Sequence, residues 1–152
     1  MLHVNQTIKL QVGVKSFIYN EAGQILLLKR NLSKYPTVNN PWDIPGGRID
    51  SESDLITNLN REIAEETGLT IGNPVLLTAQ DIIKPDLHVV RLTYVSRGTG
   101  SEVTLSDEHT EHKWLNPEEM LEIEGLDGYV KAILNDKRHM SFIKDTINND
   151  RK

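Results

Sequence analysis

A short acidic segment near the middle of the chain constrains its fold and chemistry more than any other part. The segment Arg61-Glu62-Ile63-Ala64-Glu65-Glu66-Thr67-Gly68 places three glutamates at positions i, i+3 and i+4. On an α-helix these spacings bring the side chains onto one face, about one turn apart. Because three carboxylates at that distance repel one another, a hard divalent cation bound to their oxygens would stabilise the arrangement.

The residues around the glutamates predict a helix that packs on a sheet. Ser51 or Ser53 is expected to be the N-cap, with Asp54 in the first turn, and the helix is expected to end at Gly68 after Thr67. At about 100° per residue, one apolar stripe is formed by Leu55, Ile56, Leu59 and Ile63. The glutamates lie beside this stripe, so the helix would present carboxylates at the edge of its buried face.

The stretch from Gly47 to Leu69 resembles the Nudix box. That pattern is Gly, five residues, Glu, seven residues, Arg-Glu, an aliphatic residue, any residue, Glu-Glu, any residue, Gly and an aliphatic residue. The matching positions are Gly47, Arg61, Glu62, Ile63, Glu65, Glu66, Gly68 and Leu69. The alternative is a solvated acidic helix with an Arg partner, but the flanking glycines and the preceding Trp-Asp-Ile-Pro favour the resemblance.

The resemblance implies an α/β fold, an α/β/α sandwich with a mixed β-sheet, in which the box forms a loop-helix-loop. It also implies a metal site made by the main-chain carbonyl of Gly47 and the carboxylates of Glu62, Glu65 and Glu66. Oxygen ligands of this kind favour Mg²⁺, with Mn²⁺ possible, over metals that prefer soft ligands. Arg61 would orient a glutamate, and an i,i+4 ion pair with Glu65 is a second, compatible role.

One position departs from the family pattern. Ser53 stands where the pattern has its first Glu, and Glu52 lies one residue early. A serine can cap a helix or hold a water, but it does not carry the charge of a glutamate. We therefore expect weaker support of the metal face rather than its loss, because the principal ligand candidates remain.

A second acidic segment, 106–114, leads into a tryptophan. In Nudix relatives an acidic residue in a loop shortly before a strand Trp completes the metal site or acts as general base. Glu108, six residues before Trp114, matches that placement, and Glu111 is the alternative. The i,i+3 spacing of His109 and His112 raises the question of zinc. No cysteine, third histidine or family precedent supports a closed tetrahedral site, so we expect surface or substrate-pocket residues.

Elsewhere the sequence predicts strands and helices interspersed around a mixed sheet. Strands are expected at 11–19, 24–30, 74–79, 87–96, near Val103 and at 113–115, with a short extended segment at 42–44. Helices are expected to begin at Asn116-Pro117 and to span 126–134, and the end of the chain, 148–152, is expected to fray. One domain is expected to span 1–152.

Composition narrows the possible partners. A net charge of −5 argues against binding dominated by attraction to nucleic acid or to an anionic membrane. No apolar run approaches the ~20 residues of a membrane span, and residues 1–6 show no signal-peptide pattern. The absence of cysteine fits a reducing compartment, so a cytoplasmic location is expected. A homodimer is possible, since many Nudix proteins dimerise.

The expected activity is that of a metal-dependent pyrophosphohydrolase, in which water attacks phosphorus in a nucleoside diphosphate derivative. The catalytic candidates are Glu62, Glu65, Arg61 and Glu108. Pro85 lies close to where ADP-ribose hydrolases often carry a proline, whereas the compact length also suits nucleoside triphosphate pyrophosphatases, and the sequence does not separate these substrates. Two alternatives are a nucleotide-binding or regulatory module with weak or no catalysis, which Ser53 motivates, and an acidic interaction domain without a site.

Overall fold

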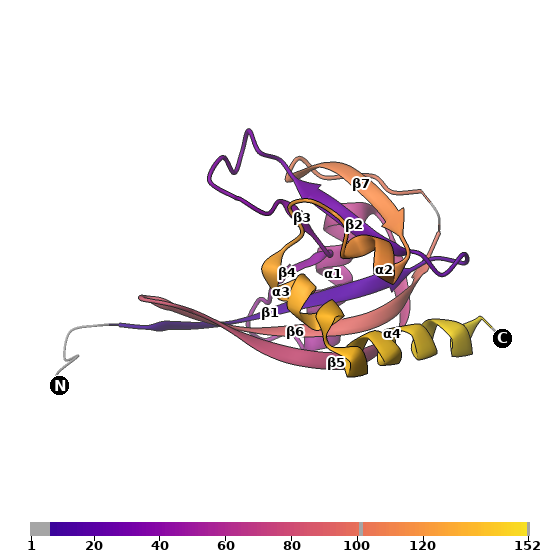
Figure 1. The fold of residues 1–152 in the computed structure, drawn as a ribbon. Helices are drawn as coiled ribbons and strands as arrows, with labels where there is room; N and C mark the ends of the chain where they lie inside the picture. The colour runs from indigo at the N-terminus through magenta and orange to yellow at the C-terminus, as the bar shows by residue number, and fades with distance from the viewer. Residues whose placement is uncertain (1–6, 101, 152) are drawn as a thin grey trace.

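The computed structural model describes residues 7–100 and 102–151 (Figure 1). The segment 1–6, over which no signal peptide is expected, lies outside the described residues, as do positions 101 and 152. In chain order the elements are β1 (Lys9–Tyr19), β2 (Ile25–Arg30), β3 (Trp42–Asp43), β4 (Gly46–Arg48), α1 (Leu55–Thr67), β5 (Thr70–Lys84), β6 (Leu87–Thr99), β7 (His109–Leu115), α2 (Pro117–Met120), α3 (Gly128–Asn135) and α4 (Lys137–Asp150).

The strands form one mixed sheet, as the sequence predicts. β1 pairs parallel with β6 and antiparallel with β2 and β4. β5 lies antiparallel to β6, and β2 also pairs antiparallel with β3 and β7. Figure 1 shows β1, β5 and β6 as long strands that extend together beyond the body of the molecule.

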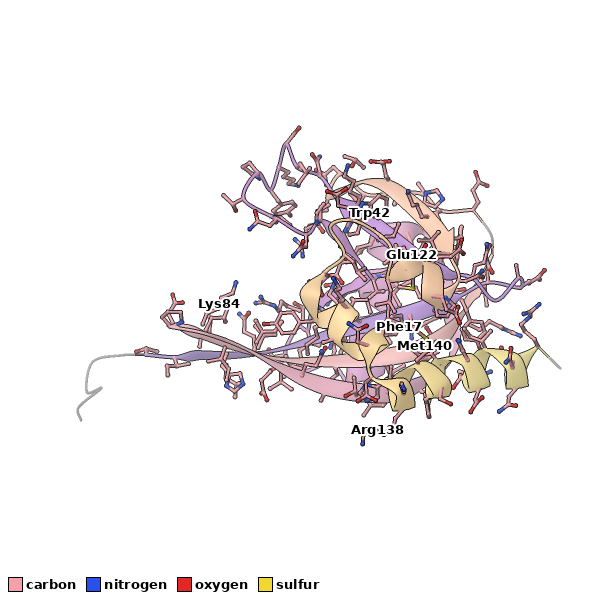
Figure 2. The ribbon with its side chains drawn as sticks, viewed as in Figure 1. Phe17, Trp42, Lys84, Glu122, Arg138 and Met140 are labelled. Atoms are coloured by element: carbon pink, nitrogen blue, oxygen red, sulfur yellow. The ribbon has the colours of Figure 1, made fainter. Side chains whose placement is uncertain are left out.

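Successive residues of the central strands point to opposite faces of the sheet, and each face packs on helices. Phe17 and Tyr19 belong to the core under α2, α3 and α4, whereas Ile18 belongs to the core under α1. Figure 2 shows Phe17 near Met140 of α4, which packs against the first of these cores. The four residues Ile25 to Leu28 divide between the two cores and are fully buried, and the α/β/α arrangement that the resemblance implies is confirmed.

The start of α1 differs from the sequence prediction. Asp54 is the N-cap, and its side chain accepts a 2.7 Å hydrogen bond from the backbone N–H of Thr57. The prediction of Ser51 or Ser53 was wrong, because Glu52 adopts a φ of 72° and turns the chain before the helix begins. The carboxylate of Asp54 also suits the positive end of the helix dipole.

The end of α1 confirms the prediction. The helix stops after Thr67, and Gly68 takes the left-handed conformation with φ 73° that favours glycine at this position. Leu59 and Ile63 are fully buried, as the stripe predicts, whereas Ile56 is an exposed large hydrophobic residue and was assigned wrongly.

The structure differs from the prediction in two further segments, one near Val103 and one at the C-terminus. Residues 102–106 form no strand, because their N–H groups bond to the end of α1: Thr104 donates to the carbonyl of Thr67 at 2.9 Å. Helix α4 was missed and continues through Asp150, so the fraying expected over 148–150 is wrong. The hydroxyl of Tyr19 donates a 2.7 Å hydrogen bond to the Asp150 carboxylate and ties this end to the sheet.

The remaining predicted elements are confirmed with shifted ends. β5 is longer than expected, since it continues through two irregularities, the first of which spans Asn73 and Pro74. Such bulges accommodate a proline that lacks an N–H to donate. None of the helices in the described part of the chain combines the length and apolar character that a membrane span requires.

Candidate active site

The two glycines before the box helix form β4, a strand that the sequence did not predict. β4 runs antiparallel to β1, with Gly46 opposite Lys15 and Gly47 opposite Val14. Gly46 has φ 142°, and a Cβ there would overlap the main chain of Val14 and Lys15. Only glycine therefore lets the chain pass this close to the central strand.

The register of β4 shows which carbonyl of the glycine pair faces the carboxylates. Ser16 donates to the Pro45 carbonyl and Ile49 donates to the Val12 carbonyl, so the intervening pair Val14–Gly47 is also a hydrogen-bonded pair of the antiparallel ladder. The Gly47 N–H and carbonyl thus point toward β1. Because a trans peptide places its C=O opposite to its N–H, the Gly46 carbonyl points away from β1. The ladder thus leaves the carbonyl of Gly46 open toward the carboxylates, whereas the family resemblance implied the carbonyl of Gly47.

Glu66 lies beneath this strand at the end of α1. Its side chain is 7% exposed, and Oε1 accepts a 2.8 Å hydrogen bond from the Gly46 N–H. Burial raises the pKa of the Glu66 carboxyl to about 7, and the charge of Lys15 together with the Gly46 hydrogen bond only partly opposes this effect. The neighbouring carboxylates of Glu62 and Glu108 add to the increase.

Glu62 is largely buried and lies directly against the glycine strand. A Cβ added to Gly47 would lie 2.6 Å from Cδ of Glu62. Burial raises the pKa of the Glu62 carboxyl, while Arg61, whose Nη1 donates a 3.0 Å hydrogen bond to Glu62 Oε1, lowers it in part. Arg61 therefore contacts a glutamate of the box, and the orienting role expected for it requires such a contact.

Glu65 occupies a different environment from the other two glutamates. Its side chain is 59% exposed, and its nearest cation is Arg61, at 3.5 Å from Nη1 to Oε1. This is the i,i+4 ion pair expected from the sequence. Glu65 does not line the cavity that contains Glu62 and Glu66.

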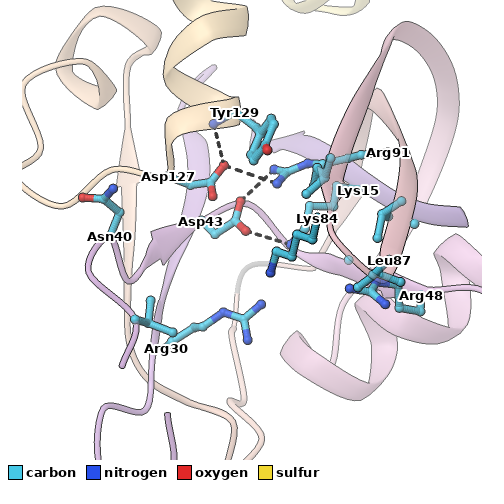
Figure 3. Close-up of a pocket in the computed structure, with 16 residues that line it drawn as sticks. Lys15, Arg30, Asn40, Asp43, Arg48, Lys84, Leu87, Arg91, Asp127 and Tyr129 are labelled. Atoms are coloured by element: carbon cyan, nitrogen blue, oxygen red, sulfur yellow. Dashed lines mark hydrogen bonds and ion pairs between the residues drawn. The ribbon is translucent and has the colours of Figure 1, made fainter. Parts of the chain in front are cut away.

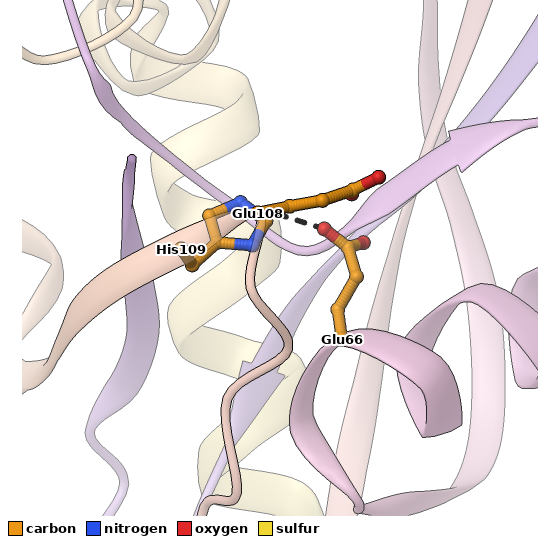
Figure 4. A group of neighbouring side chains, drawn as sticks. All are labelled: Glu66, Glu108 and His109. Carbon is orange, nitrogen blue, oxygen red and sulfur yellow. Dashed lines mark ion pairs between the residues drawn. The ribbon is translucent and has the colours of Figure 1, made fainter. Parts of the chain in front are cut away.

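The loop before β7 brings Glu108 to the buried end of α1. Ligand atoms of Glu66, Glu108 and His109 all lie within 4.8 Å of one another, the group of potential metal ligands that the described residues form (Figure 4). His109 Nε2 lies 3.5 Å from Glu66 Oε2, and burial lowers the pKa of the His109 imidazole to about 4, so the ring is neutral at pH 7. The imidazole Nδ1 is buried without a hydrogen-bond partner among the described residues.

The other two candidate residues of this segment, Glu111 and His112, do not line the cavity that contains Glu66. Glu111, the alternative to Glu108, forms a 3.1 Å ion pair with Lys29, so both side chains are engaged on the surface of the sheet. His112 is exposed and, unlike His109, lines neither of the two cavities described below.

Two adjoining cavities open at this site. The smaller, here called the carboxylate cavity, has a volume of about 250 Å³ and is lined by Glu62, Glu66, Glu108 and His109 together with the glycine pair. The larger, here called the basic cavity, measures about 560 Å³. Both are lined by Lys15, Arg30 and Arg48, so positive charge lies where the two meet.

A buried ion-pair network forms one wall of the basic cavity (Figure 3). Asp43 accepts from Lys15 at 3.0 Å and from Arg91 at 2.9 Å, and Arg91 also contacts Asp127 at 3.2 Å. Burial alone would raise the pKa of Asp43, but Lys15 and Arg91 outweigh it and lower the pKa to about 2. The sequence analysis missed this network, because its members come from β1, β3, β6 and the N-cap of α3.

Aromatic side chains divide between the core and the cavities. Trp42 is buried in the core under α2, α3 and α4, and Trp114 packs against the core under α1. Tyr129 of α3 lines the basic cavity, where Arg91 lies 5.8 Å from the centre of its ring. Arg30 lines both cavities and lies over the ring of Tyr35.

The donor atoms at the carboxylate cavity fit a hard divalent cation. Two clustered carboxylates, a third at Glu62 and the outward Gly46 carbonyl supply oxygen ligands of the kind that Mg²⁺ and Mn²⁺ take. A cation there would also stabilise the charged form of Glu66, whose pKa is raised by burial first and by the neighbouring carboxylates second.

Comparisons with known proteins agree with this geometry. Residues 9–135 match the NUDIX domain family. A MutT-like protein of Streptomyces ambofaciens is 27% identical over 111 residues, which cover 73% of this chain and 67% of that protein. Nudix hydrolase 8 of Arabidopsis thaliana is 30% identical over 59 residues, which cover 39% of this chain and 16% of that protein.

Solved structures of the family share the whole fold. The crystal structure of a MutT protein from Methanosarcina mazei Go1 superposes with a TM-score of 0.69 at 25% identity, covering 98% of this chain and 99% of that chain. The MutT NUDIX hydrolase from Burkholderia pseudomallei gives a TM-score of 0.71 at 25% identity, covering 85% and 98%. Members of this family act on small nucleotide derivatives and generally use a divalent metal. The chain belongs to the Nudix family and is a Nudix hydrolase.

Proposed function

We propose that the chain is a metal-dependent pyrophosphohydrolase that cleaves the diphosphate linkage of a nucleoside diphosphate derivative, such as a nucleoside triphosphate or an ADP-ribose-like compound. The observation that carries this proposal is the meeting of Glu66, Glu108 and His109 within 4.8 Å, beside Glu62, in the smaller of two adjoining cavities. A diphosphate could lie across the junction while the rest of the substrate occupies the larger cavity.

The metal ligands would come from three segments of the chain. Glu66 and Glu108 are the primary candidates, with Glu62 and the Gly46 carbonyl beside them. Glu65 could join only by leaving its exposed ion pair with Arg61. When bound, Mg²⁺ or Mn²⁺ would neutralise phosphoryl oxygens and lower the pKa of a bound water.

The chain's own groups would orient the water and the diphosphate. Glu62 has a partly buried carboxylate that Arg61 holds on one side, and burial raises the pKa of this carboxyl, which makes it a stronger base than an exposed glutamate. Glu108 is the second candidate for this role, since it lines the same cavity from the opposite loop. Lys15 and Arg30 line both cavities and would stabilise the negative charge of the phosphates.

The basic cavity would hold the part of the substrate that is not hydrolysed. Tyr129 offers an aromatic surface on which a nucleobase could stack. Asp127 Oδ2 is engaged by Arg91 and by two N–H groups of α3, which leaves Oδ1 as a possible acceptor for a base amino group. His109, neutral at pH 7, would position Glu66 rather than carry charge.

A substrate panel tests the proposal. Nucleoside triphosphates, ADP-ribose, nucleotide sugars and dinucleoside polyphosphates would each be incubated with Mg²⁺, with Mn²⁺ and with a chelator, and the products identified. We expect metal-dependent release of pyrophosphate or of a nucleoside monophosphate from at least one substrate. Tight binding of a nucleotide without turnover would instead support a binding or regulatory module, and neither binding nor turnover would refute both.

A further inference from the structure

A buried asparagine on α1 connects the loop of the box to its arginine. Asn58 is fully buried, although it lies on the helix that carries the glutamates. Its amide nitrogen donates to the carbonyls of Ser53 at 3.1 Å, Asp54 at 2.9 Å and Asp50 at 3.3 Å. Its amide oxygen accepts a 2.8 Å hydrogen bond from the Asp50 N–H. One side chain thus fixes the whole turn between β4 and α1.

The same amide oxygen also holds Arg61. Nη2 of Arg61 donates a 2.9 Å hydrogen bond to Asn58 Oδ1 and lies 3.4 Å from the carboxylate of Asp50. Nη1 faces the other way and contacts Glu62 at 3.0 Å. The guanidinium is therefore held on one edge by Asn58 and Asp50 while its other edge holds Glu62.

This arrangement bears on the departure from the family pattern at Ser53. The Ser53 side chain is exposed and does not line the carboxylate cavity, and only its main-chain carbonyl takes part in the arrangement, through Asn58. No carboxylate at position 53 is available to Arg61. Asp50, three residues earlier, supplies the acidic group that lies beside Nη2.

We propose that Asn58 is a positioning residue for hydrolysis: together with Asp50 it orients Arg61, and through Arg61 it orients Glu62, in place of the acidic group that Ser53 lacks. The proposal rests on the proposed function for its catalytic consequence. The geometric part stands on the hydrogen bonds alone. Because a planar guanidinium directs its donors in a fixed fork, fixing one edge also fixes the other.

The first test compares two asparagines of the same helix. Asn58→Ala is expected to lower kcat by about 10- to 100-fold, the effect of losing hydrogen bonds to a charged group, with KM within about twofold. Asn60→Ala is the matched control, because Asn60 is exposed and its amide donates to the Ile56 carbonyl one turn earlier on the same helix. We expect Asn60→Ala to leave kcat unchanged.

A double-mutant cycle with Arg61→Ala distinguishes positioning from a structural role. If Asn58 acts through Arg61, Asn58→Ala has little further effect on kcat once Arg61 is absent. An equal loss in both backgrounds would overturn the proposal, as would an unchanged kcat in the single variant. Should Asn58→Ala fail to fold, Asp50→Asn replaces it, since that side chain is 75% exposed. Asp50→Asn is expected to lower kcat less than Asn58→Ala does. Like Asn58→Ala, it is expected to have little further effect on kcat once Arg61 is replaced by Ala.

A readout independent of turnover separates this proposal from the proposed function. In ¹⁵N spectra of the guanidinium groups, Arg61, assigned by its disappearance in Arg61→Lys, is expected to give separate Nη signals in the wild type and in Asn60→Ala. In Asn58→Ala the signals are expected to merge as rotation becomes free. Separate signals in an inactive wild type would refute only the proposed function, whereas merged signals in the wild type would refute the positioning role.

Discussion

The carboxylate of Glu62 lies directly against the α-carbon of Gly47, so that a side chain at position 47 and the present position of Glu62 exclude each other. A Cβ at Gly47 would lie 2.6 Å from Cδ of Glu62, well inside the contact distance of two carbon atoms. The glycine that opens the box is thus required by the glutamate that lies 15 residues later.

Gly47→Ala is therefore expected to displace Glu62 and to lower kcat by about 100-fold, as a misplacement of 1 Å does in a catalytic site. Gly72→Ala serves as the control, since a Cβ at Gly72 meets nothing within 4 Å. Steady-state kinetics and thermal unfolding of both variants give the comparison. Wild-type turnover in Gly47→Ala would show that the position of Glu62 does not matter for the reaction.

The box could be predicted because its geometry is local. The helical spacing of Glu62, Glu65 and Glu66 follows from the sequence alone, and so does the left-handed cap at Gly68. What the spacing does not give is which glutamate is buried, because that depends on the strand that lies over the helix. The spacing places the three glutamates on one face of the helix, but the side chain of Glu66 is 7% exposed and that of Glu65 is 59% exposed.

Because Glu66 is buried and Glu65 is exposed, their substitutions are expected to lower kcat by different amounts. Glu66→Gln is expected to lower kcat more than about 100-fold, because it removes a charge from the ligand cluster. Glu65→Gln is expected to lower kcat less than about tenfold, because Glu65 forms an exposed ion pair with Arg61 and does not line the carboxylate cavity. Kinetics at saturating Mn²⁺ and Mg²⁺ would check this order, and the reverse order would place Glu65 among the ligands.

Burial of Glu66 also couples stability to pH in the metal-free protein. Since the folded-state pKa is raised from 4.5 to about 7, the folded protein keeps a proton that the unfolded chain has lost between these values. Stability is therefore expected to fall by up to about 3 kcal/mol as pH rises through this window. Urea unfolding at pH 5 and at pH 8 would measure the change.

Glu66→Gln carries no titrating group at this position, so its stability is expected to lose this part of the pH dependence. Added Mn²⁺ is expected to stabilise the wild type more at pH 8 than at pH 5, because the ligand must be deprotonated. Parallel pH profiles of the wild type and the variant would contradict the burial of the Glu66 charge.

The ion pairs of Asp43 give the opposite pH dependence. Its pKa is lowered from 3.8 to about 2, so its stabilisation is complete above the unfolded value and is lost as pH falls through about 2. Asp43→Asn is expected to lower the free energy of unfolding at pH 7 by about 3 to 5 kcal/mol, because Lys15 and Arg91 stay buried without their shared partner. Denaturant unfolding checks this, with the exposed Asp145→Asn as control. Equal stabilities at pH 7 would show that the network is not a source of stability.

The network around Asp43 could not be predicted, because its members are far apart in the sequence. Asp43 lies 28 residues from Lys15 and 48 from Arg91, and only the register of the sheet brings them together. Helix α4 is a different case, since its signals were present. Asp136 caps it, and Met140, Ile143 and Ile147 follow at helical spacing with the last two buried.

The most direct test measures metal binding and turnover on the same samples of wild type, Glu66→Gln and the exposed control Glu21→Gln. Mn²⁺ affinity would be followed by calorimetry, and hydrolysis of the best substrate of the panel would be followed with Mn²⁺ and with a chelator. We expect the wild type and Glu21→Gln to bind Mn²⁺ and turn over only with metal, and Glu66→Gln to lose both properties together. Turnover that persists in the chelator, or in Glu66→Gln without Mn²⁺ binding, would contradict a metal-dependent reaction at the carboxylate cavity.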